Sequence, residues 1–124
     1  MTRIRIRWDA GEVTGTLNDS GTARELAEVL PCEGLANTWG EEAYFEIPLD
    51  VSLDSEPKQV VDPGTICYWV QGQAVALPYG PTPISQGNEC RLVTACNVIG
   101  EVDGDARQLA TIAEGMTLTL ERLE

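Results

Sequence analysis

Residues 37–48 read Asn-Thr-Trp-Gly-Glu-Glu-Ala-Tyr-Phe-Glu-Ile-Pro, and they contain the only Phe of the chain. After Gly40, apolar and polar side chains alternate up to the proline, which is typical of a half-buried strand. Gly40 itself indicates a tight turn or a bulge, where a side chain would obstruct the backbone. These residues therefore predict a β-hairpin or one bent strand with aromatic rings on both faces. The outward rings would need a second layer or a ligand to cover them.

The composition is that of a globular domain. The chain has 124 residues, of which 43% are hydrophobic, so we expect a single domain over residues 1–124 with a substantial core. No apolar run approaches the roughly 18 residues that a membrane helix needs. Residues 2–8 alternate charged and apolar side chains instead of forming a charged head before an apolar block, which argues against a secretory signal. The cytoplasm is therefore the expected location.

The charge balance narrows the choice of partners. The chain carries 20 acidic and 8 basic residues, which gives a net charge of −12. Such a charge repels nucleic acid and anionic lipid, so we expect neither nucleic acid nor a membrane among the partners. Two explanations for the charge stay open. It could attract a basic partner, or it could be an adaptation to high internal salt, as in a halophile, where salt screens the self-repulsion.

Alternating and apolar runs predict further strands along the chain. Residues 2–8 and 12–17 should form a hairpin whose row of arginines pairs with carboxylates on neighbouring strands. Residues 49–63 are polar and indicate a long surface connection. The other expected strands are residues 65–70, 74–77, 92–102 and 116–123.

Two short helices are expected between these strands. Residues 18–21, Asn-Asp-Ser-Gly, end the preceding strand and supply helix-capping side chains. In residues 22–30 the apolar side chains recur at helical spacing, and Thr22 with Glu25 three positions later fits a capping box. Asp105 is a suitable cap for a second helix over residues 106–113. Short strands, tight turns, two short helices and no βαβ rhythm together predict an all-β fold, a closed or nearly closed antiparallel barrel with helices covering its ends.

The cysteines give little evidence for a metal or a disulfide. Cys32, Cys67, Cys90 and Cys96 form no Cys-x-x-Cys pair, and the chain has no His. A zinc site is therefore a weak hypothesis, and we expect neither a metal nor a cofactor. Free thiols are the expectation in a reducing compartment, although Cys90 and Cys96 could pair across a loop. Without His, neither a Ser-His-Asp nor a Cys-His catalytic arrangement can be assembled.

Four ordered motifs add information that the patterns do not contain. They are Asn37 to Phe45, Gly64-x-x-x-Tyr68-Trp69, Tyr79-Gly80-Pro81-Thr82-Pro83 and Asn97-Val98-Ile99-Gly100. In the order and spacing of these motifs, the chain resembles the small stand-alone cyclophilin-like proteins of bacteria and archaea over nearly its whole length. The resemblance implies a closed eight-stranded antiparallel cyclophilin-like β-barrel with two short helices at its ends. That family is uncharacterised, so the resemblance implies an architecture far more than an activity.

The resemblance also brings an enzymatic alternative. Cyclophilin-type prolyl isomerases bind an X-Pro segment on an apolar floor, where an arginine stabilises the twisted amide with help from a glutamine and an aromatic rim. This chain departs from that pattern, because it has no His, no Arg-x-x-x-x-Phe-x-x-Gln and no arginine inside the four motifs. An atypical peptidyl-prolyl cis-trans isomerase stays open as an alternative, since the reaction needs a partly apolar site and a donor to the prolyl nitrogen.

The favoured hypothesis is a non-enzymatic binding module. It would receive a small molecule or an extended, proline-containing peptide in a shallow apolar cleft. Two distant segments would supply the aromatic walls, and a few polar groups would orient the ligand. The predicted walls are Trp39, Tyr44, Phe45, Tyr79 and Pro83, and the predicted polar groups are Glu42, Thr82 and Asn97.

Glu42 has two interpretations within this hypothesis. A carboxyl that faces a cleft would have a raised pKa and could take part in acid–base chemistry. Alternatively, it could accept hydrogen bonds from Asn97, Thr38 or backbone amides and fix the hairpin, because structural networks perturb carboxylates as well. The structural interpretation is the one that we favour from the sequence.

Overall fold

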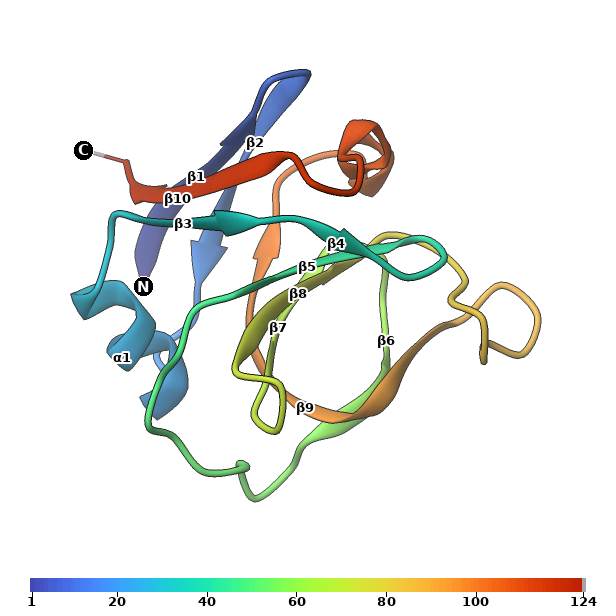
Figure 1. Ribbon diagram of the computed structural model, residues 1–124. Coiled ribbons are helices and arrows are strands. Elements are labelled where there is room, and N and C mark those ends of the chain that lie inside the picture. Colours follow the sequence, from blue (N-terminus) through green and yellow to red (C-terminus); the bar gives the residue numbers. More distant parts are fainter. Residues whose placement is uncertain (124) are drawn as a thin grey trace.

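One antiparallel sheet runs through residues 1–123, which are the residues that the computed structural model describes (Figure 1). Its strands are β1 (Thr2–Trp8), β2 (Gly11–Leu17), β3 (Cys32–Leu35), β4 (Asn37–Thr38), β5 (Glu42–Glu46), β6 (Lys58–Val61), β7 (Thr65–Trp69), β8 (Ala74–Pro78), β9 (Cys90–Val102) and β10 (Thr117–Arg122). Hydrogen bonds join them in the order β3-β10-β1-β2-β9-β7-β8-β5-β4, and β6 pairs with β9 outside this path.

The two ends of this path approach each other and nearly close the sheet into a barrel. A Cβ atom added at Gly34 in β3 would lie 3.1 Å from the carbonyl oxygen of Glu46 in β5, so the absence of a side chain allows this close approach. The prediction of an all-β antiparallel barrel is confirmed. The short strands β4 and β6 bring the number of strands in residues 1–123 to ten.

The hairpin of β1 and β2 has one face in the core and one in water, as its alternation predicts. Ile4 and Ile6 are buried, while the arginines that alternate with them lie at the surface. The expected pairing with carboxylates on neighbouring strands is confirmed for Arg5 and Arg7, whose partner lies in β10, whereas the partner of Arg3 lies just after the end of β9. Arg3 pairs with Asp103 at 2.6 Å, Arg5 pairs with Glu121, and Arg7 pairs with Glu121 at 3.3 Å.

Both short helices are present, and the first one is capped from the predicted residues 18–21, although not by the predicted capping box. Helix α1 covers Gly21–Glu28, and its N-cap is Ser20, whose side chain accepts a hydrogen bond from the amide of Ala23. The capping box of Thr22 and Glu25 is therefore wrong, because the helix begins before Thr22 and the buried Thr22 side chain faces the core instead.

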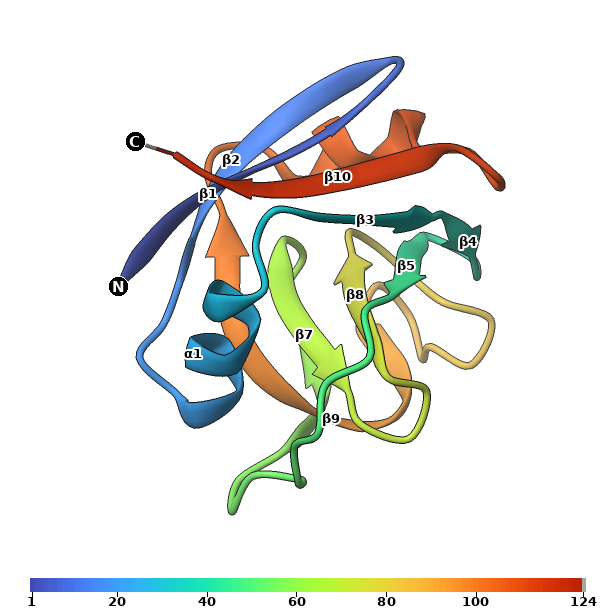
Figure 2. The same cartoon turned by 60° about the vertical axis from the view of Figure 1, so that its left-hand side comes forward.

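The second helix, η1 (Ala106–Thr111), is a short 3₁₀ helix. Asp105 caps it as predicted, because its side chain accepts from the amide of Arg107. Figure 2 shows α1 beside the lower part of the barrel and the orange helix η1 behind β10, so the two helices cover different parts of it. Among residues 1–123, no helix is long and apolar enough to span a bilayer.

The long strand β9 divides the molecule into two packed regions. Its second half pairs with β7 and β2, whereas its first half pairs with β6, a strand that lies in the expected surface connection. Figure 1 shows this first half of β9, with β6 beside it, curving away from β7 and β8. The main core fills the inside of the barrel, and a second, much smaller cluster lies outside it, made of Cys67, Ala76, Leu92 and Cys96.

Candidate functional site

The candidate site lies on the outer face of β5, β8 and β7. Side chains alternate between two faces along a strand, and the pairing register places Tyr44, Ala76 and Cys67 opposite one another on adjacent strands. Their sequence neighbours point the other way, into the barrel. The small outer cluster thus covers one face of these strands while the main core covers the other.

A pocket of about 160 Å³ opens on this outer face, between the three strands and the first half of β9. Its wall is almost entirely aromatic and aliphatic. Val93 is 50% exposed and marks the mouth, whereas Glu42 is only 6% exposed and lies deep in the wall. The lining residues are Trp39, Glu42, Tyr44, Trp69, Ala76, Leu92, Val93 and Cys96.

Two of the aromatic rings are arranged at a right angle. The ring centroids of Tyr44 and Trp69 lie 6.0 Å apart with an interplanar angle of 88°, which is the edge-to-face geometry that aromatic pairs prefer. The two residues come from the non-adjacent strands β5 and β7, with the small Ala76 on the strand between them, and their contacting rings together form one wall of the pocket.

The pocket contains the two buried side-chain polar atoms of residues 1–123 that lack a hydrogen-bond partner, Glu42 Oε1 and Trp69 Nε1. Most buried polar groups are hydrogen-bonded, so two unpaired atoms in one pocket need an explanation. Burial raises the pKa of the Glu42 carboxyl to about 7. This carboxyl therefore changes its charge near neutral pH.

The structural interpretation of Glu42 from the sequence is wrong in its named partners. Thr38 donates from its amide and its hydroxyl to Glu114 Oε1, at 2.7 and 3.0 Å. The side chain of Asn97 is fully buried and donates to Thr22 Oγ1 and to the carbonyl oxygen of Ser52. Neither residue has a donor left for Glu42, and the carboxyl remains without a partner at Oε1.

Asn97 was expected to be a polar group of the cleft, and the structure places it elsewhere. Its Oδ1 accepts from the amide of Asp54 at 2.7 Å, and its Nδ2 donates to Thr22 in α1 and to Ser52. It thus ties helix α1 and the segment before β6 to the middle of β9. It does not line the pocket.

Phe45 and Tyr79 also lie outside the pocket, in the main core. Phe45 is 0% exposed because it alternates with Tyr44 and faces the inside of the barrel. Tyr79 is 9% exposed, and the guanidinium of Arg107 lies 5.2 Å from its ring centroid. Arg107 also pairs with Glu41 at 2.8 Å. The Tyr79 ring therefore already contacts a cation of the protein itself.

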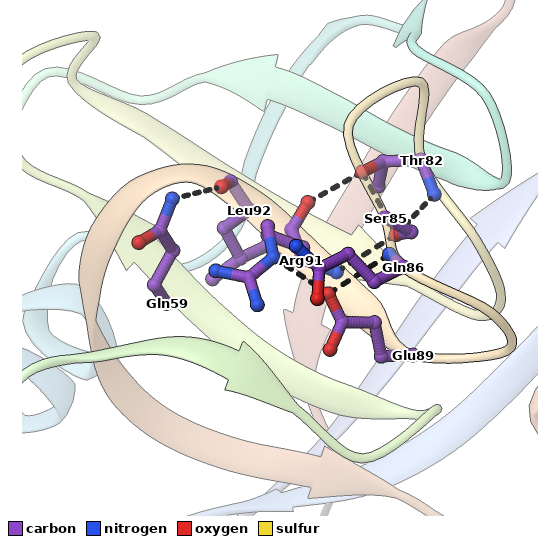
Figure 3. Close-up of polar contacts among 7 residues, drawn as sticks. All are labelled: Gln59, Thr82, Ser85, Gln86, Glu89, Arg91 and Leu92. Atoms are coloured by element: carbon purple, nitrogen blue, oxygen red, sulfur yellow. Dashed lines mark hydrogen bonds and ion pairs between the residues drawn. The ribbon is translucent and has the colours of Figure 1, made fainter.

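Thr82 holds the loop that precedes β9 (Figure 3). Its hydroxyl donates to the carbonyl oxygen of Arg91, and its amide donates to Ser85 Oγ at 2.8 Å. Ser85 Oγ also accepts from the amide of Arg91 at 3.1 Å. The Glu89 carboxylate accepts from the Gln86 amide and from Arg91 Nε at 3.0 and 2.6 Å. Thr82 therefore fixes the start of β9, whose residues Leu92 and Val93 line the pocket, and it does not line the pocket itself.

The two predicted segments do meet, but without a hollow between them. The amide of Glu41 donates to the carbonyl oxygen of Pro81 at 2.9 Å, and the amide of Tyr79 donates to the carbonyl oxygen of Glu41 at 2.9 Å. Gly40 has φ +60°, as expected for a turn, and a Cβ atom there would lie 2.8 Å from Pro83 Cδ. Pro83 is exposed and packs on this glycine instead of lining the pocket.

Of the eight predicted residues, the structure brings three together in the pocket, Trp39, Glu42 and Tyr44. The remaining lining residues were not predicted to belong to a site. Trp69 carried the clearest signal, because residues 65–70 form a nearly continuous apolar run, which is typical of a strand that is covered on both faces. The others are Ala76, Leu92, Val93 and Cys96. No sequence pattern predicts the curvature of the strands that bring them together.

The thiols near the pocket are buried and free. All four cysteines are unpaired, so the possible bond between Cys90 and Cys96 is not formed. Burial raises the pKa of Cys96 to about 12 and that of Cys90 to about 11, and it raises the pKa of Cys67 as well. These thiols stay protonated at neutral pH and are poor nucleophiles. In the described part of the chain, no three His, Cys, Asp or Glu side chains gather closely enough to hold a metal ion.

Comparisons with known proteins concern the whole barrel. A scan against models of protein families matches residues 2–121 to the family described as Cyclophilin-like. Among solved structures, the fold is similar to the solution structure of a hypothetical protein from Archaeoglobus fulgidus, with 34% sequence identity and a TM-score of 0.82. The match covers 98% of this chain and 95% of that chain. A search of curated proteins finds no match.

Proposed function

The chain belongs to the Cyclophilin-like family, and we propose that it is a non-enzymatic binding module that uses the pocket on the outer face of β5, β8 and β7. The guest would be a small molecule, or one side chain of an extended peptide. One observation carries the proposal. A hollow walled by aromatic and aliphatic side chains contains a buried carboxyl with no partner, which is the composition of a ligand site.

The size of the pocket supports a small guest. A cavity of roughly 150 Å³ in an engineered protein accommodates a benzene molecule. The pocket here is of about 160 Å³, so a ring-sized or branched group would fill it. An extended peptide would insert a single side chain and lie across the mouth beside Val93. The net charge of −12 makes nucleic acid and anionic membranes poor partners for this surface.

The alternative function, an atypical peptidyl-prolyl cis-trans isomerase, has one observation in its favour. The reaction needs an apolar site with a donor to the prolyl nitrogen, and Trp69 Nε1 is an unpaired donor in an apolar pocket. Binding alone does not require that a donor reach the prolyl nitrogen, so binding is the simpler function. An isomerisation assay on a proline peptide separates the two, because a pure binding module leaves the uncatalysed rate unchanged.

The indole resonances of the three tryptophans test the binding function. Trp39 and Trp69 line the pocket, whereas Trp8 lies in the main core and its Nε1 donates to Thr111 Oγ1 at 2.9 Å. We would titrate the ¹⁵N-labelled protein with ring-sized and branched compounds, both neutral and charged. The proposal expects saturable shifts of Trp39 and Trp69 with at least one compound while Trp8 stays in place. No shift with any compound would overturn it.

A matched pair of variants then locates the guest. Val93→Tyr places a ring at the mouth of the pocket, and Val60→Tyr makes the same change at a similarly exposed position of β6 that does not line it. We expect the first variant to abolish the shifts and the second to keep them. Equal binding by both variants would mean that the guest lies elsewhere.

A further inference from the structure

We propose that the guest of this pocket is a small organic cation, whose ammonium group pairs with Glu42 against the faces of Trp39, Tyr44 and Trp69. The inference rests on the proposed binding function and names the chemical class of the ligand. Four features of the pocket and of the chain carry it: the unpaired carboxyl, the aromatic walls, the overall charge and the unpaired indole N–H.

The carboxyl determines the sign of the ligand charge. A carboxylate only accepts hydrogen bonds, and Oε1 of Glu42 has no donor within the protein. A buried charge is normally paired, because an isolated one loses the solvation that water would give it. A guest with a positive charge provides the missing partner, whereas a purely apolar guest would fill the space and leave the carboxyl unpaired.

The aromatic walls suit the same guest. The face of an aromatic ring carries negative potential, so cations bind within about 6 Å of a ring centroid, and Trp is the strongest such partner. The pocket has two Trp and one Tyr, and the rings of Tyr44 and Trp69 stand at 88° to each other, 6.0 Å apart. Because the two rings contact each other edge to face, they form one aromatic wall, and Trp39 adds a third ring to the lining of the pocket. Alkylated ammonium groups are typical guests of sites lined by aromatic rings.

The charge of the whole chain favours the approach of cations. A net charge of −12 produces a negative potential that raises the local concentration of positive ligands near the surface. Lys58 is the only lysine of the chain, so few ammonium groups of the protein itself compete for such a site. The same potential disfavours anionic guests, which would also meet the carboxyl inside.

The unpaired indole N–H narrows the chemical class of the ligand further. Trp69 Nε1 only donates, so it requires an acceptor that Glu42 does not provide, since neither atom has a partner. A ligand that carries an oxygen close to its ammonium group would supply a counter-charge to the carboxylate and an acceptor to the indole N–H. A hydroxyl-bearing alkylammonium ion is the simplest compound with this chemistry.

Choline and its uncharged isostere 3,3-dimethyl-1-butanol form the decisive pair of probes, because they have the same shape and the same hydroxyl. We would titrate each at about pH 8, where the Glu42 carboxyl is largely ionised, and follow the indole resonances of Trp39, Trp69 and Trp8. We expect choline to bind with a Kd about tenfold or more below that of the isostere. Trp39 and Trp69 should shift while Trp8 stays in place.

Two variants test which side chains cause the preference for choline over the isostere. Glu42→Gln keeps the shape of the side chain and removes the charge, so the preference for choline should fall to the part that the aromatic rings supply, while the isostere binds as before. Tyr44→Leu keeps an apolar wall without a π face, so choline alone should weaken. The unchanged resonance of Trp8 reports that each variant is folded.

Each failure has a separate meaning. Equal affinity for choline and the isostere in the unmodified protein would overturn the cation inference and leave the binding function standing. The same conclusion follows if neither compound binds while a neutral aromatic compound does. If Glu42→Gln keeps the full preference for choline, the carboxyl is not the counter-ion and the inference is wrong. If no compound shifts the indole resonances of Trp39 and Trp69, the binding function itself is wrong.

Discussion

The two faces of β5, β8 and β7 are packed in opposite ways. On the inner face, Phe45, Tyr68 and Leu77 are 0% exposed, and the Tyr68 hydroxyl donates to the Ile47 carbonyl oxygen at 2.8 Å and accepts from the Leu49 amide at 3.0 Å. On the outer face of the same strands there is a pocket of about 160 Å³ with an unpaired carboxyl and an unpaired indole N–H. Among residues 1–123, the buried side-chain polar atoms without a partner both lie on the outer face, and this difference is what supports the proposed ligand site.

The contrast also separates stability from function within single strands. Alternation places neighbouring residues on different faces, so Phe45 packs in the core while Tyr44, next to it, lines the pocket. Substitutions at adjacent positions should therefore have effects of very different size. The following changes test this difference, beginning with the largest.

The largest expected effect is the difference between Phe45→Ala and Tyr44→Ala. Removing the fully buried Phe45 ring leaves a cavity in the core and should cost about 3–5 kcal/mol of unfolding free energy. Removing Tyr44 should cost only about 1 kcal/mol, mainly through the lost edge-to-face contact with Trp69. Urea unfolding of both variants measures the difference, and equal losses would mean that the two faces are packed alike.

The next effect concerns the charge of Glu42. Its pKa in the folded protein is about 7, above its ordinary value of 4.5, so the folded state binds the proton more tightly than the unfolded state does. The stabilisation from the protonated form is complete below pH 4.5 and is lost as the pH rises to about 7. One pKa unit corresponds to about 1.4 kcal/mol, so the ionised carboxyl costs up to about 3 kcal/mol above this range.

Glu42→Gln removes this cost. We expect the variant to gain up to about 3 kcal/mol over the unmodified protein between acidic and mildly basic pH, measured by urea unfolding across the range. From β7 the thiol of Cys67 faces Glu42, and from β9 the thiols of Cys90 and Cys96 do, but burial keeps all three protonated there. A stability difference between the two proteins that does not vary with pH would show that Glu42 is not the titrating group.

The exposed Glu46 at the other end of β5 provides a control for the same chemical change. Its side chain stays in water in the folded and the unfolded protein, so Glu46→Gln should not produce the pH-dependent gain expected for Glu42→Gln. A similar gain for both variants would attribute the effect to the net charge of the protein instead of the pocket.

A smaller effect should distinguish two alanines that lie on opposite faces. Ala43 is 0% exposed in the main core, and a leucine there has no room, so Ala43→Leu should cost about 1–3 kcal/mol. Ala76 lines the pocket, and the extra carbons of Ala76→Leu would enter the hollow, so its stability should stay within about 1 kcal/mol. The same variant should lose ligand binding. A penalty for Ala76→Leu as large as that for Ala43→Leu would contradict the presence of usable space.

Much of the barrel could be predicted from the sequence, because alternation reports directly which strands have one covered face. The hairpin of β1 and β2, the turn at Gly40 and the cap at Asp105 follow from local chemistry and are found as expected. The cap of α1 lies in the predicted residues 18–21, at Ser20, but the capping box of Thr22 and Glu25 is not formed, because Ser20 and Thr22 are both able to cap a helix and only tertiary packing selects between them.

The site could be predicted less well, for a physical reason. Periodicity identified Glu42 and Tyr44 as lying on the face opposite to Phe45, but it could not say which of the two faces contained the hollow. That depends on the bend of β9 and its pairing with β6, contacts between residues that lie far apart in the chain. The aromatic residues Phe45 and Tyr79 looked like cleft walls because the sequence does not distinguish a ring that covers a ligand from a ring that fills a core.

The most direct measurement is the nuclear Overhauser effect between the methyl protons of the tighter-binding probe, choline or 3,3-dimethyl-1-butanol, and the aromatic protons of the protein. The two faces carry different rings, Tyr44 and Trp69 outside and Phe45 and Tyr68 inside, so the contacts report the position of the guest. We expect intermolecular contacts to Tyr44 and Trp69 and none to Phe45 or Tyr68. Contacts to the inner rings, or to no ring at all, would contradict a binding pocket on the outer face.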